Sequence, residues 1–400
     1  MSIGNQLGAV REVALKPSQT PVSSERIAVC HVASGDRWAG AEVQIATLLK
    51  TLVRRGEFEL SAILLNEGRL AQEVRNCGIP VAVIPETRRT IFGILREAKR
   101  FLSGKAVKVL HSHRYKENLL AALLARQCNV PVLVRTQHGL PEPFRGFRNL
   151  KQQLLQRLDM FVARRATDGV IGVSEEMRRR LMPLIPEGKI YVIPNSIDLD
   201  CVDSELSPEQ AKSRLGIPAG APVIGAAGRL DPIKRLDLFL AAAQEIARQL
   251  PEARFVIGGE GAEEAKLRRL ASDIGLAAQA LFLGHRNDVY DVLRSFDILV
   301  LCSDHEGLPT VLLEALQLGV PVVARRVGGI GEVIEDRGTG LLVDSADASA
   351  LAEACVLLLR DAELRQRLRE AGSLRVSEQY DSSKAAAAVA ALYGSLCEAR

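Results

Sequence analysis

The chain reads SDHEGLPTVLLEALQLGVP over residues 303–321, shortly after the mostly apolar run 297–301. Pro309 fits the first turn of a helix, where a missing N–H group removes no hydrogen bond. Gly319, followed two residues later by a proline, ends that helix, and a second apolar run begins at Val320. The stretch therefore predicts a strand, a polar loop, a helix and a second strand, which together form the repeating unit of a parallel α/β sheet.

The start of this helix offers the groups that an anion needs. The unpaired N–H groups of Thr310 and Val311 point from the carboxyl end of a strand into solvent, where the helix dipole favours a phosphate. Glu306 in the loop and Glu314 on the helix are eight residues apart. Carboxylates repel a phosphate but accept hydrogen bonds from sugar hydroxyls. An anion site with two hydroxyl acceptors beside it suits a nucleotide-sugar.

The composition is that of a globular protein with two domains. The chain has 400 residues, 47% hydrophobic and 25% charged, and this length exceeds one hydrophobic core. No apolar run approaches the roughly 20 residues of a membrane span. Residues 1–24 lack the basic and apolar regions of a signal peptide, so we expect a disordered tail there. Seven scattered cysteines, with no Cys-x-x-Cys pair, predict reduced thiols in a cytoplasmic protein.

The two halves of the chain carry opposite charge. Residues 1–200 hold 30 Lys and Arg against 19 Asp and Glu, a balance of +11, and residues 201–400 hold 22 against 29, a balance of −7. The first half is therefore predicted to meet anionic surfaces or substrates. We expect no nucleic-acid partner.

Short apolar runs alternate with amphipathic helical patterns, which predicts parallel sheets covered by helices on both faces. A polar segment at 197–221 interrupts the rhythm, and we interpret it as a linker between two doubly wound, Rossmann-like α/β domains that face a central cleft. The predicted strands are 27–33, 60–65, 81–84, 107–110, 131–135, 169–173 and 191–193, then 223–227, 254–257, 280–283, 298–301, 321–324 and 340–343. The predicted boundaries are 25–200 for the N-terminal domain, 201–380 for the C-terminal domain and 381–400 for a last helix.

Two cations follow the first strand of the second domain, in GAAGRLDPIKR at 225–235. Gly228 supplies a tight turn, and Arg229 and Lys234 leave the carboxyl end of the strand five residues apart. An Arg fork and a Lys point charge can clamp a diphosphate. The alternative is a solvated loop with surface charges.

Three of the six histidines follow predicted strands. His111 and His113 come after the strand at 107–110, and His138 comes after the strand at 131–135. Their spacing fits no compact zinc motif. A single histidine is usually structural, but the place of His138 at a strand's carboxyl end favours a functional role.

An Asp-x-Asp pair, Asp198 and Asp200, lies at the start of the predicted linker. Such a pair can hold a divalent ion, but Asp and Asn also dominate turns, and we interpret this pair as turn chemistry. The loop at 33–42, ASGDRWAGAE, joins a strand to a helix through glycines but lacks Gly-x-Gly-x-x-Gly spacing. A hydride-transferring dinucleotide enzyme is therefore disfavoured.

The ordered set of these stretches resembles the family 4 retaining glycosyltransferases, which have the GT-B fold. The resemblance covers nearly everything from residue 27 to the end. It implies an enzyme that keeps the anomeric configuration, requires no metal or other cofactor, and has a last helix that crosses back to the first domain. The segments that carry it are EGLPTVLLEAL at 306–316, PVVARRVGGIGEVI at 321–334, GRLDPIKR at 228–235, IPNSID at 193–198 and GAE at 40–42.

The resemblance also implies a role for each site residue. Arg229 and Lys234 would hold the donor diphosphate, Glu314 would bind the ribose and Glu306 the donor sugar. His138 would lie beside the donor sugar and the acceptor. His138, Glu306, Arg229 and Lys234 are the implied catalytic residues. The positions implied to approach the donor through backbone or small side chains are Gly40, Gly228, Gly307, Leu308, Thr310 and Val311.

The basic first domain is the predicted acceptor side. His111, His113 and Arg145 are the candidate acceptor residues. The basic positions could instead be solvated helix faces, as charge runs usually are. The functional hypothesis is attachment to an anionic membrane that carries a lipid-linked or lipopolysaccharide-type acceptor. The basic candidates are Arg88, Arg89, Arg96, Lys99, Arg100 and Lys105, and Arg145, Arg148, Lys151, Arg157, Arg164 and Arg165.

These observations predict a cytoplasmic glycosyltransferase of cell-envelope or exopolysaccharide synthesis that can attach to the inner face of the membrane. A UDP-sugar is the first expectation for the donor and GDP-mannose the second, by family frequency. Two alternatives stay open. One is a nucleotide-sugar epimerase with the same fold, and the other is a non-catalytic subunit that binds a nucleotide-sugar.

Overall fold

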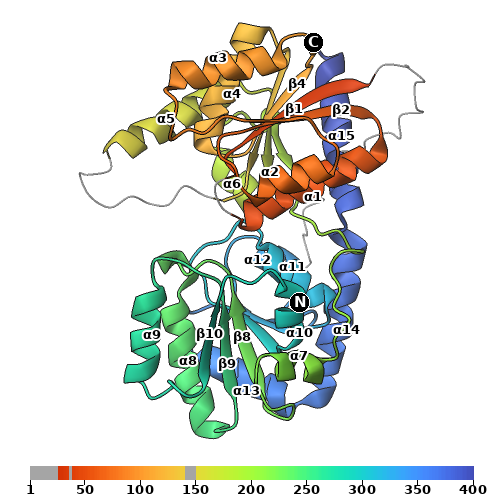
Figure 1. The fold of residues 1–400 in the computed structure, drawn as a ribbon. Coiled ribbons are helices and arrows are strands. Elements are labelled where there is room, and N and C mark those ends of the chain that lie inside the picture. Colours follow the sequence, from red (N-terminus) through yellow and green to blue (C-terminus); the bar gives the residue numbers. More distant parts are fainter. Residues whose placement is uncertain (1–25, 36–37, 140–149) are drawn as a thin grey trace, which may run out of the picture.

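The structure is a computed structural model that describes residues 26–35, 38–139 and 150–400. The tail predicted at 1–24 lies outside them. Figure 1 shows two α/β domains, one above the other, with the last helices of the chain running along one side of both. Among the described residues, no helix combines the length and the apolar character that a membrane crossing requires.

The N-terminal domain has a seven-stranded parallel sheet in the order β3-β2-β1-β4-β5-β6-β7. One of its inner strands reads IAVCHVA and is buried along nearly its whole length, as expected of a parallel strand that helices cover on both faces. The strands are β1 (Ile27–Ala33), β2 (Phe58–Leu64), β3 (Val81–Val83), β4 (Val109–Ser112), β5 (Val132–Gln137), β6 (Gly169–Gly172) and β7 (Ile190–Val192). The helices are α1 (Gly40–Arg55), α2 (Arg69–Asn76), α3 (Ile91–Leu102), α4 (Tyr115–Cys128), α5 (Leu150–Arg165) and α6 (Glu175–Leu181).

The C-terminal domain repeats this design with a six-stranded sheet in the order β10-β9-β8-β11-β12-β13. In both sheets the order reverses beside the first strand of the domain, and ligands of such sheets bind at the carboxyl ends of the strands near that point. The strands are β8 (Val223–Ala227), β9 (Arg254–Gly258), β10 (Ala280–Gly284), β11 (Ile298–Leu301), β12 (Val322–Arg325) and β13 (Leu341–Val343). The helices are α7 (Pro208–Arg214), α8 (Leu236–Gln249), α9 (Glu264–Asp273), α10 (Val289–Arg294), α11 (Thr310–Gln317), α12 (Ile330–Val333), α13 (Ala348–Arg360) and α14 (Ala362–Gln379).

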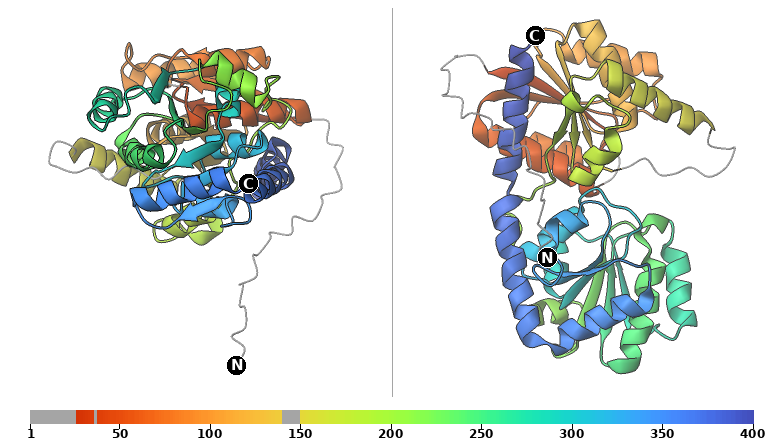
Figure 2. Two further views of the ribbon diagram at one scale, coloured as in Figure 1. Left: turned by 90° about the horizontal axis from the view of Figure 1, so that it is seen from below. Right: turned by 180° about the vertical axis from the view of Figure 1, so that it is seen from behind.

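The chain crosses between the domains twice. Ile197 forms a parallel bridge with Asp381, so the outward and return crossings lie side by side. After the return, α15 (Ser382–Glu398) packs its buried face, including Tyr393, into the core beneath β1. The view from behind in Figure 2 shows α14 and α15 following one another along the two domains. The predicted fold class, two doubly wound domains with a final helix that crosses back, is confirmed.

The segment predicted as a linker, 197–221, contains the helix α7. Ser207 and Gln210 form a reciprocal capping box at its start, and Pro208 occupies its first turn, which together define a helix N-terminus. Arg214 at its end pairs with Asp291 of α10 at 2.7 Å. This part of the segment therefore belongs to the C-terminal domain. Its polar composition predicts a linker, but the structure shows a short surface helix there.

Candidate active site

Lys234 and Glu306 form an ion pair at the carboxyl end of the second sheet. Lys234 Nζ lies 2.6 Å from Glu306 Oε1, and the Ser303 hydroxyl donates to the same oxygen, also at 2.6 Å. Gly228, at the end of β8, has a φ of 145°, a backbone conformation that glycine alone adopts readily. The turn that follows carries Lys234 in the short helix Pro232–Lys234. Two loops from separate strands thus bring an amine and a carboxylate together.

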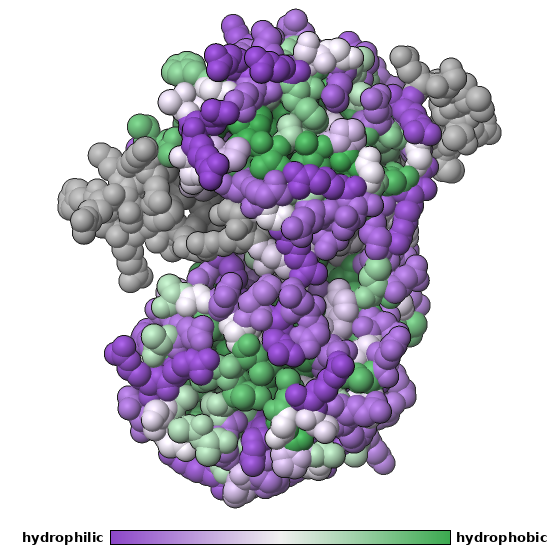
Figure 3. All heavy atoms as spheres, viewed as in Figure 1, coloured by the Kyte–Doolittle hydropathy of each residue, from purple (hydrophilic) through white to green (hydrophobic). Residues whose placement is uncertain are grey.

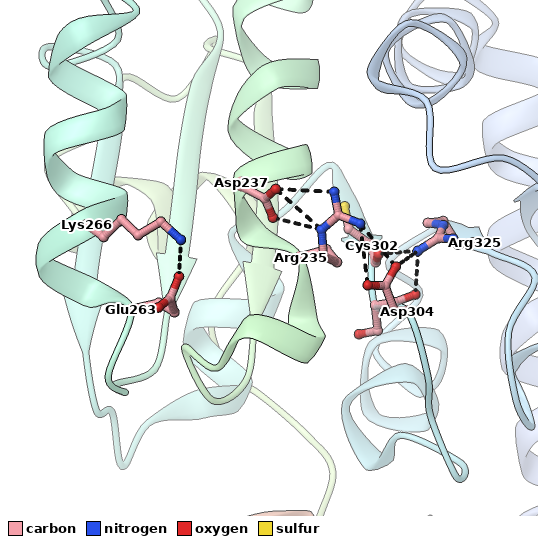
Figure 4. A network of polar contacts seen from close by, with 8 residues as sticks. Arg235, Asp237, Glu263, Lys266, Cys302, Asp304 and Arg325 are labelled. Atoms are coloured by element: carbon pink, nitrogen blue, oxygen red, sulfur yellow. Dashed lines mark hydrogen bonds and ion pairs between the residues drawn. The ribbon is translucent and has the colours of Figure 1, made fainter. Parts of the chain in front are cut away.

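The loop that carries Glu306 is fixed from both sides, as Figure 4 shows for Asp304. Arg325 Nη1 donates to Asp304 Oδ1 at 2.5 Å and to the carbonyl of Ser303 at 3.0 Å. Arg235 Nη1 donates to the same Oδ1 at 3.2 Å and to Oδ2 of Asp304 at 3.4 Å. The amide of Asp304 also donates to the carbonyl of Ile233, at 2.9 Å. Because one loop is bonded directly to the other, Glu306 and Lys234 keep their relative positions before any ligand binds.

Arg229 stands apart from this pair. It forms its own ion pair with Asp231 at 2.6 Å, and its side chain is 44% exposed. The predicted two-cation clamp is therefore only half assembled among the described residues. Lys234 is held against Glu306, while Arg229 lies at the surface of the same turn, where a ligand can reach it.

Glu314 lies in the buried part of α11. Its side chain has no hydrogen bond or ion pair among the residues that the structure describes, and burial raises the pKa of its carboxyl group to about 7. A buried carboxylate without a partner is costly to keep. Hydroxyl donors from a ligand would satisfy it, and the contact to a ribose stays a prediction.

The N-termini of α1 and α11 meet at the junction of the two domains. Gln44 of α1 donates to the Thr310 hydroxyl at 3.2 Å, next to Gly40 at the start of α1. Neither helix has a side-chain cap at its N-cap residue, Ala39 or Pro309. Two helix N-termini that face the same junction without a capping side chain favour an anion there.

Gly307 lies close against the backbone of His138 across the junction of the two domains. A Cβ atom added to Gly307 would lie 2.2 Å from the carbonyl oxygen of His138, so only glycine fits. On its other side, the Gly307 carbonyl accepts a hydrogen bond from Gly329 at 2.7 Å. His138 and the Glu306–Gly307 turn therefore form one continuous surface, although 168 residues of sequence separate His138 from Glu306.

His111 and His113 do not lie on an acceptor-facing surface. Both are buried, with exposures of 0% and 3%, because they end a central strand that is covered on both faces. His113 Nδ1 lies 3.2 Å from His138 Nε2, so His113 stands behind His138. The expectation that His111 and His113 contact an acceptor is therefore wrong. The third acceptor candidate, Arg145, lies outside the described residues.

Asp198 is paired with two cations of α1. Its carboxylate lies 3.0 Å from Lys50 Nζ and 3.1 Å from Arg54 Nη1. These contacts give Asp198 a structural role at the point where the chain leaves the N-terminal domain.

Four polar residues at the site were not among the predicted site residues. Gln44 joins α1 to the crossing segment, since its side chain also bonds Ser196 N and O at 2.9 and 2.8 Å. Asn195 donates to the Leu308 carbonyl at 2.7 Å, and Ser303 supports Glu306. Glu332 accepts from the amides of Glu175 and Glu176, both at 2.9 Å. A signal existed for Gln44, which is one helical turn after Gly40, and for Asn195, which lies within the IPNSID segment.

Comparison with known families agrees with this architecture. The family model described as Glycosyltransferase Family 4 matches residues 38–201, and the model described as Glycosyl transferases group 1 matches residues 208–375. The two matches together span both domains.

Two curated relatives have names that describe glycosyl transfer. The chain is 27% identical to the Escherichia coli UDP-Gal:alpha-D-GlcNAc-diphosphoundecaprenol alpha-1,3-galactosyltransferase, over 78% of this chain and 82% of the relative. It is 30% identical to the D-inositol 3-phosphate glycosyltransferase of Xylanimonas cellulosilytica, over 77% of this chain and 76% of the relative.

Solved structures share the fold. Anabaena HepE in complex with UDP-glucose superposes with a TM-score of 0.82 at 20% identity, covering 92% of this chain and 100% of HepE. WaaG, a glycosyltransferase involved in lipopolysaccharide biosynthesis, superposes with a TM-score of 0.70 at 17% identity, covering 90% of this chain and 98% of WaaG. The resemblance inferred from the sequence is confirmed, and this chain belongs to the family 4 glycosyltransferases, with their GT-B fold.

Proposed function

We propose that this enzyme transfers a hexosyl-type sugar from a UDP-sugar to a glycan or lipid-linked acceptor, with retention of the anomeric configuration and without a metal ion. The observation that carries the proposal is the Lys234–Glu306 pair beside the N-terminus of α11, with Glu314 buried and without a partner on that helix. Lys234 and the N-terminus of α11 match a diphosphate, Glu306 matches a donor sugar and Glu314 matches a ribose.

The leaving diphosphate develops negative charge as the bond to the sugar breaks. Lys234, the nearby Arg229 and the N-terminus of α11 supply positive charge at fixed positions before the reaction, which is the most effective form of electrostatic stabilisation. This set of cationic and N–H groups is sufficient in kind to replace a divalent ion, so we assign the stabilisation to the protein.

Glu306 and Glu314 then orient the two sugar rings. Glu306 offers Oε2 to the donor sugar, because Oε1 is already engaged by Lys234 and Ser303. Glu314 accepts hydrogen bonds from the ribose hydroxyls. As the anomeric carbon gains oxocarbenium character, the acceptor hydroxyl would attack from the face that the diphosphate leaves and pass its proton to the departing phosphate oxygen, and the configuration would be kept. Closure of the domains around the donor would exclude water.

The choice of a UDP-sugar rests on the proteins that this chain resembles. The Escherichia coli relative is named for UDP-Gal, and HepE was solved with UDP-glucose. GDP-mannose is the second candidate. The same Escherichia coli relative is named for a diphosphoundecaprenol acceptor, which supports a lipid-linked acceptor for this chain.

An amphipathic surface on α5 supports attachment to a membrane. Leu154, Leu158 and Phe161 follow helical spacing and are 66%, 47% and 58% exposed. Arg164 and Arg165 end the same helix. Exposed apolar side chains with adjacent cations are what an anionic bilayer surface binds. We therefore propose that α5 of the N-terminal domain docks on the inner face of the membrane.

The donor and the reaction are tested together. Purified protein is first screened for thermal stabilisation by UDP-glucose, UDP-galactose, UDP-N-acetylglucosamine and GDP-mannose, because a ligand of the folded state raises the melting temperature. The stabilising donor, radiolabelled in its sugar, is then incubated with a bacterial lipid extract. Label in the lipid phase, joined with unchanged anomeric configuration by NMR, is the expected result. Conversion of the donor to an epimer, or binding without turnover, would refute the proposal.

Membrane attachment is tested by sedimentation with phosphatidylglycerol-containing vesicles at low salt. We expect the wild type to sediment and a Leu154→Ser, Phe161→Ser double variant to remain in solution. Leu374→Ser on α14 removes a side chain that is 58% exposed in the other domain, and this control should sediment like the wild type. Equal sedimentation of all three proteins would argue against docking through α5.

On the face seen in Figure 3, a band of hydrophilic side chains separates a hydrophobic area in each domain. A charged donor and a sugar suit such a band, whereas the lipid part of an acceptor would stay with the apolar side chains of α5.

A further inference from the structure

Four imidazoles, a tyrosine and a threonine form a buried chain of hydrogen bonds that ends at His138. His138 Nε2 lies 3.2 Å from His113 Nδ1, and His113 Nε2 lies 3.0 Å from His31 Nδ1. Beyond His31, the contacts run through the hydroxyl of Tyr393, at 3.4 Å from His31 Nε2 and 2.5 Å from His111 Nδ1. His111 Nε2 then lies 2.8 Å from the Thr136 hydroxyl.

The fold explains why these side chains meet. His31 on β1 and His111 on β4 are register partners in adjacent parallel strands, so their side chains project on the same face. Tyr393 reaches them from α15, the helix that returns from the other domain, and is 0% exposed. This chain of hydrogen bonds thus links α15 to His138 at the active site.

The four histidines of this hydrogen-bond chain are neutral at pH 7. Burial lowers the pKa of His31 to about 3 and that of His138 to about 4, and it lowers the pKa of His111 and His113 well below the usual value. A neutral imidazole has one N–H donor and one acceptor nitrogen. If one nitrogen donates, the other must accept, so the direction chosen at one link fixes the direction of every other link.

Thr136 sets that direction. Its side chain is 8% exposed, and among the described residues His111 Nε2 is the one partner of its hydroxyl. A buried hydroxyl hydrogen without an acceptor is costly, so Thr136 donates to His111 Nε2. His111 Nδ1 then donates to Tyr393, Tyr393 donates to His31, His31 donates to His113, and His113 donates to His138 Nε2. The hydrogen of His138 is left on Nδ1.

We propose that this chain is a positioning device that holds His138 as a hydrogen-bond donor, with its hydrogen on Nδ1, facing the donor sugar. His138 Nδ1 is buried and has no partner among the described residues, and His138 lies against Gly307, next to Glu306. This inference rests on the proposed function for its substrate, an oxygen of the nucleotide-sugar. It assigns positioning roles to His113, His31, Tyr393, His111 and Thr136, and it excludes His138 as a general base.

The three imidazoles of His31, His111 and His113 offer nitrogens within 4.8 Å of one another, a separation at which a metal ion could also be held. In the hydrogen-bonded arrangement each of these nitrogens already has a partner, so a metal would have to break the chain. The two possibilities make opposite predictions for added Zn²⁺.

The test is the protonation of His138, read by long-range ¹H–¹⁵N NMR of protein labelled with ¹⁵N-histidine, with His138→Gln used to assign the signals. We expect hydrogen on Nδ1 in the wild type. Tyr393→Phe keeps the ring in the core but breaks the chain, so His138 should show both tautomers. Tyr191→Phe, the same change in β7 of the same domain, should leave the tautomer unchanged.

A second pair of variants separates positioning from folding. In His113→Asn the side-chain amide can donate a hydrogen to His138 Nε2, whereas the side chain in His113→Ala cannot. His113→Asn should therefore keep the Nδ1 tautomer, and His113→Ala should lose it, with kcat falling about tenfold at saturating donor, the size of one oriented hydrogen bond. Hydrogen on Nε2 in the wild type, an unchanged tautomer in Tyr393→Phe and His113→Ala, or Zn²⁺-shifted imidazole signals would overturn the proposal. If the tautomers behave as expected but no sugar is transferred, the proposed function alone fails.

Discussion

Lys234 Nζ lies 2.6 Å from Oε1 of Glu306, and the two side chains come from loops that follow β8 and β11. The pair is largely shielded, with side-chain exposures of 21% for Lys234 and 10% for Glu306. Each group therefore depends on the other, since either one alone would be a poorly solvated charge. A donor diphosphate that approaches Lys234 meets an amine whose position is already fixed.

The first prediction concerns Lys234→Ala. We expect kcat/KM to fall by about 10²- to 10³-fold, as when one preorganised donor to a developing charge is removed. Steady-state kinetics with the donor identified by thermal stabilisation provide the measurement. Lys266→Ala is the matched control, because Lys266 also forms a 2.6 Å pair with a glutamate, Glu263, but lies on α9 with 71% exposure. A similar loss in both variants would mean that Lys234 contributes no more than general surface charge.

Gly307→Ala tests the close contact between the domains. The new methyl group would lie 2.2 Å from the carbonyl oxygen of His138, a separation at which the backbone must move. We expect at least a tenfold loss of kcat, because misplacing a catalytic loop by about 1 Å can cost 10²-fold. Gly188→Ala adds a methyl group that meets nothing within 4 Å and should leave kcat unchanged. Wild-type turnover by Gly307→Ala would show that the domains need not approach at this point.

Glu314→Gln tests the ribose contact through pH. Burial raises the pKa of the Glu314 carboxyl to about 7, and the ionised form is the better acceptor for ribose hydroxyls. Donor affinity should therefore weaken as the pH falls below about 7. The variant should bind about 10- to 100-fold more weakly, the range for hydrogen bonds to a charged group, and should lose this pH dependence.

Calorimetric titration between pH 5.5 and 8.5 provides this measurement. An intact UDP-sugar is used instead of UDP, because the terminal phosphate of UDP titrates in the same range. If the donor affinity of wild type and of Glu314→Gln showed the same pH dependence, Glu314 would not be the group that binds the ribose.

The sequence predicted the frame of the site because local chemistry determines it. Pro309 and Gly319 delimit α11 in the structure to within one or two residues, and Gly228 takes the positive φ that its turn required. Lys234 and Glu306 each follow the end of a predicted apolar strand. The parallel order of the sheet then brings those ends to one edge, where the two side chains pair.

Other contacts depend on tertiary packing, which spacing along the chain does not reveal. His31 was not a candidate because it lies inside an apolar strand, and only the register with His111 makes it part of a chain of imidazoles. Tyr393 lies 282 residues from its partner His111. Similarly, Arg229 and Lys234 looked equivalent in sequence, but the turn between them directs one toward Asp231 and the other toward Glu306.

The last prediction concerns acid stability. The buried histidines have folded-state pKa values below the usual 6.5, at about 3 for His31 and about 4 for His138. The unfolded chain therefore binds more protons below pH 6.5, and stability present above that pH is lost as the pH falls toward the folded-state values. Each such histidine contributes a slope of up to about 1.4 kcal/mol per pH unit. The pKa of Glu314 is raised, so its contribution to stability has the opposite sign. The stability that Glu314 contributes at low pH is lost as the pH rises through about 7.

His113→Asn isolates one of these contributions while retaining a hydrogen-bond donor to His138. In urea unfolding followed from pH 8 to pH 5, the difference in unfolding free energy between wild type and variant should stay constant above about pH 7. Below pH 6.5 it should shift in favour of the variant, because the variant has one histidine fewer to protonate on unfolding. A difference that stayed constant down to pH 5 would mean that His113 is not held neutral by burial, and the donor direction assigned to the whole imidazole chain would lose its basis.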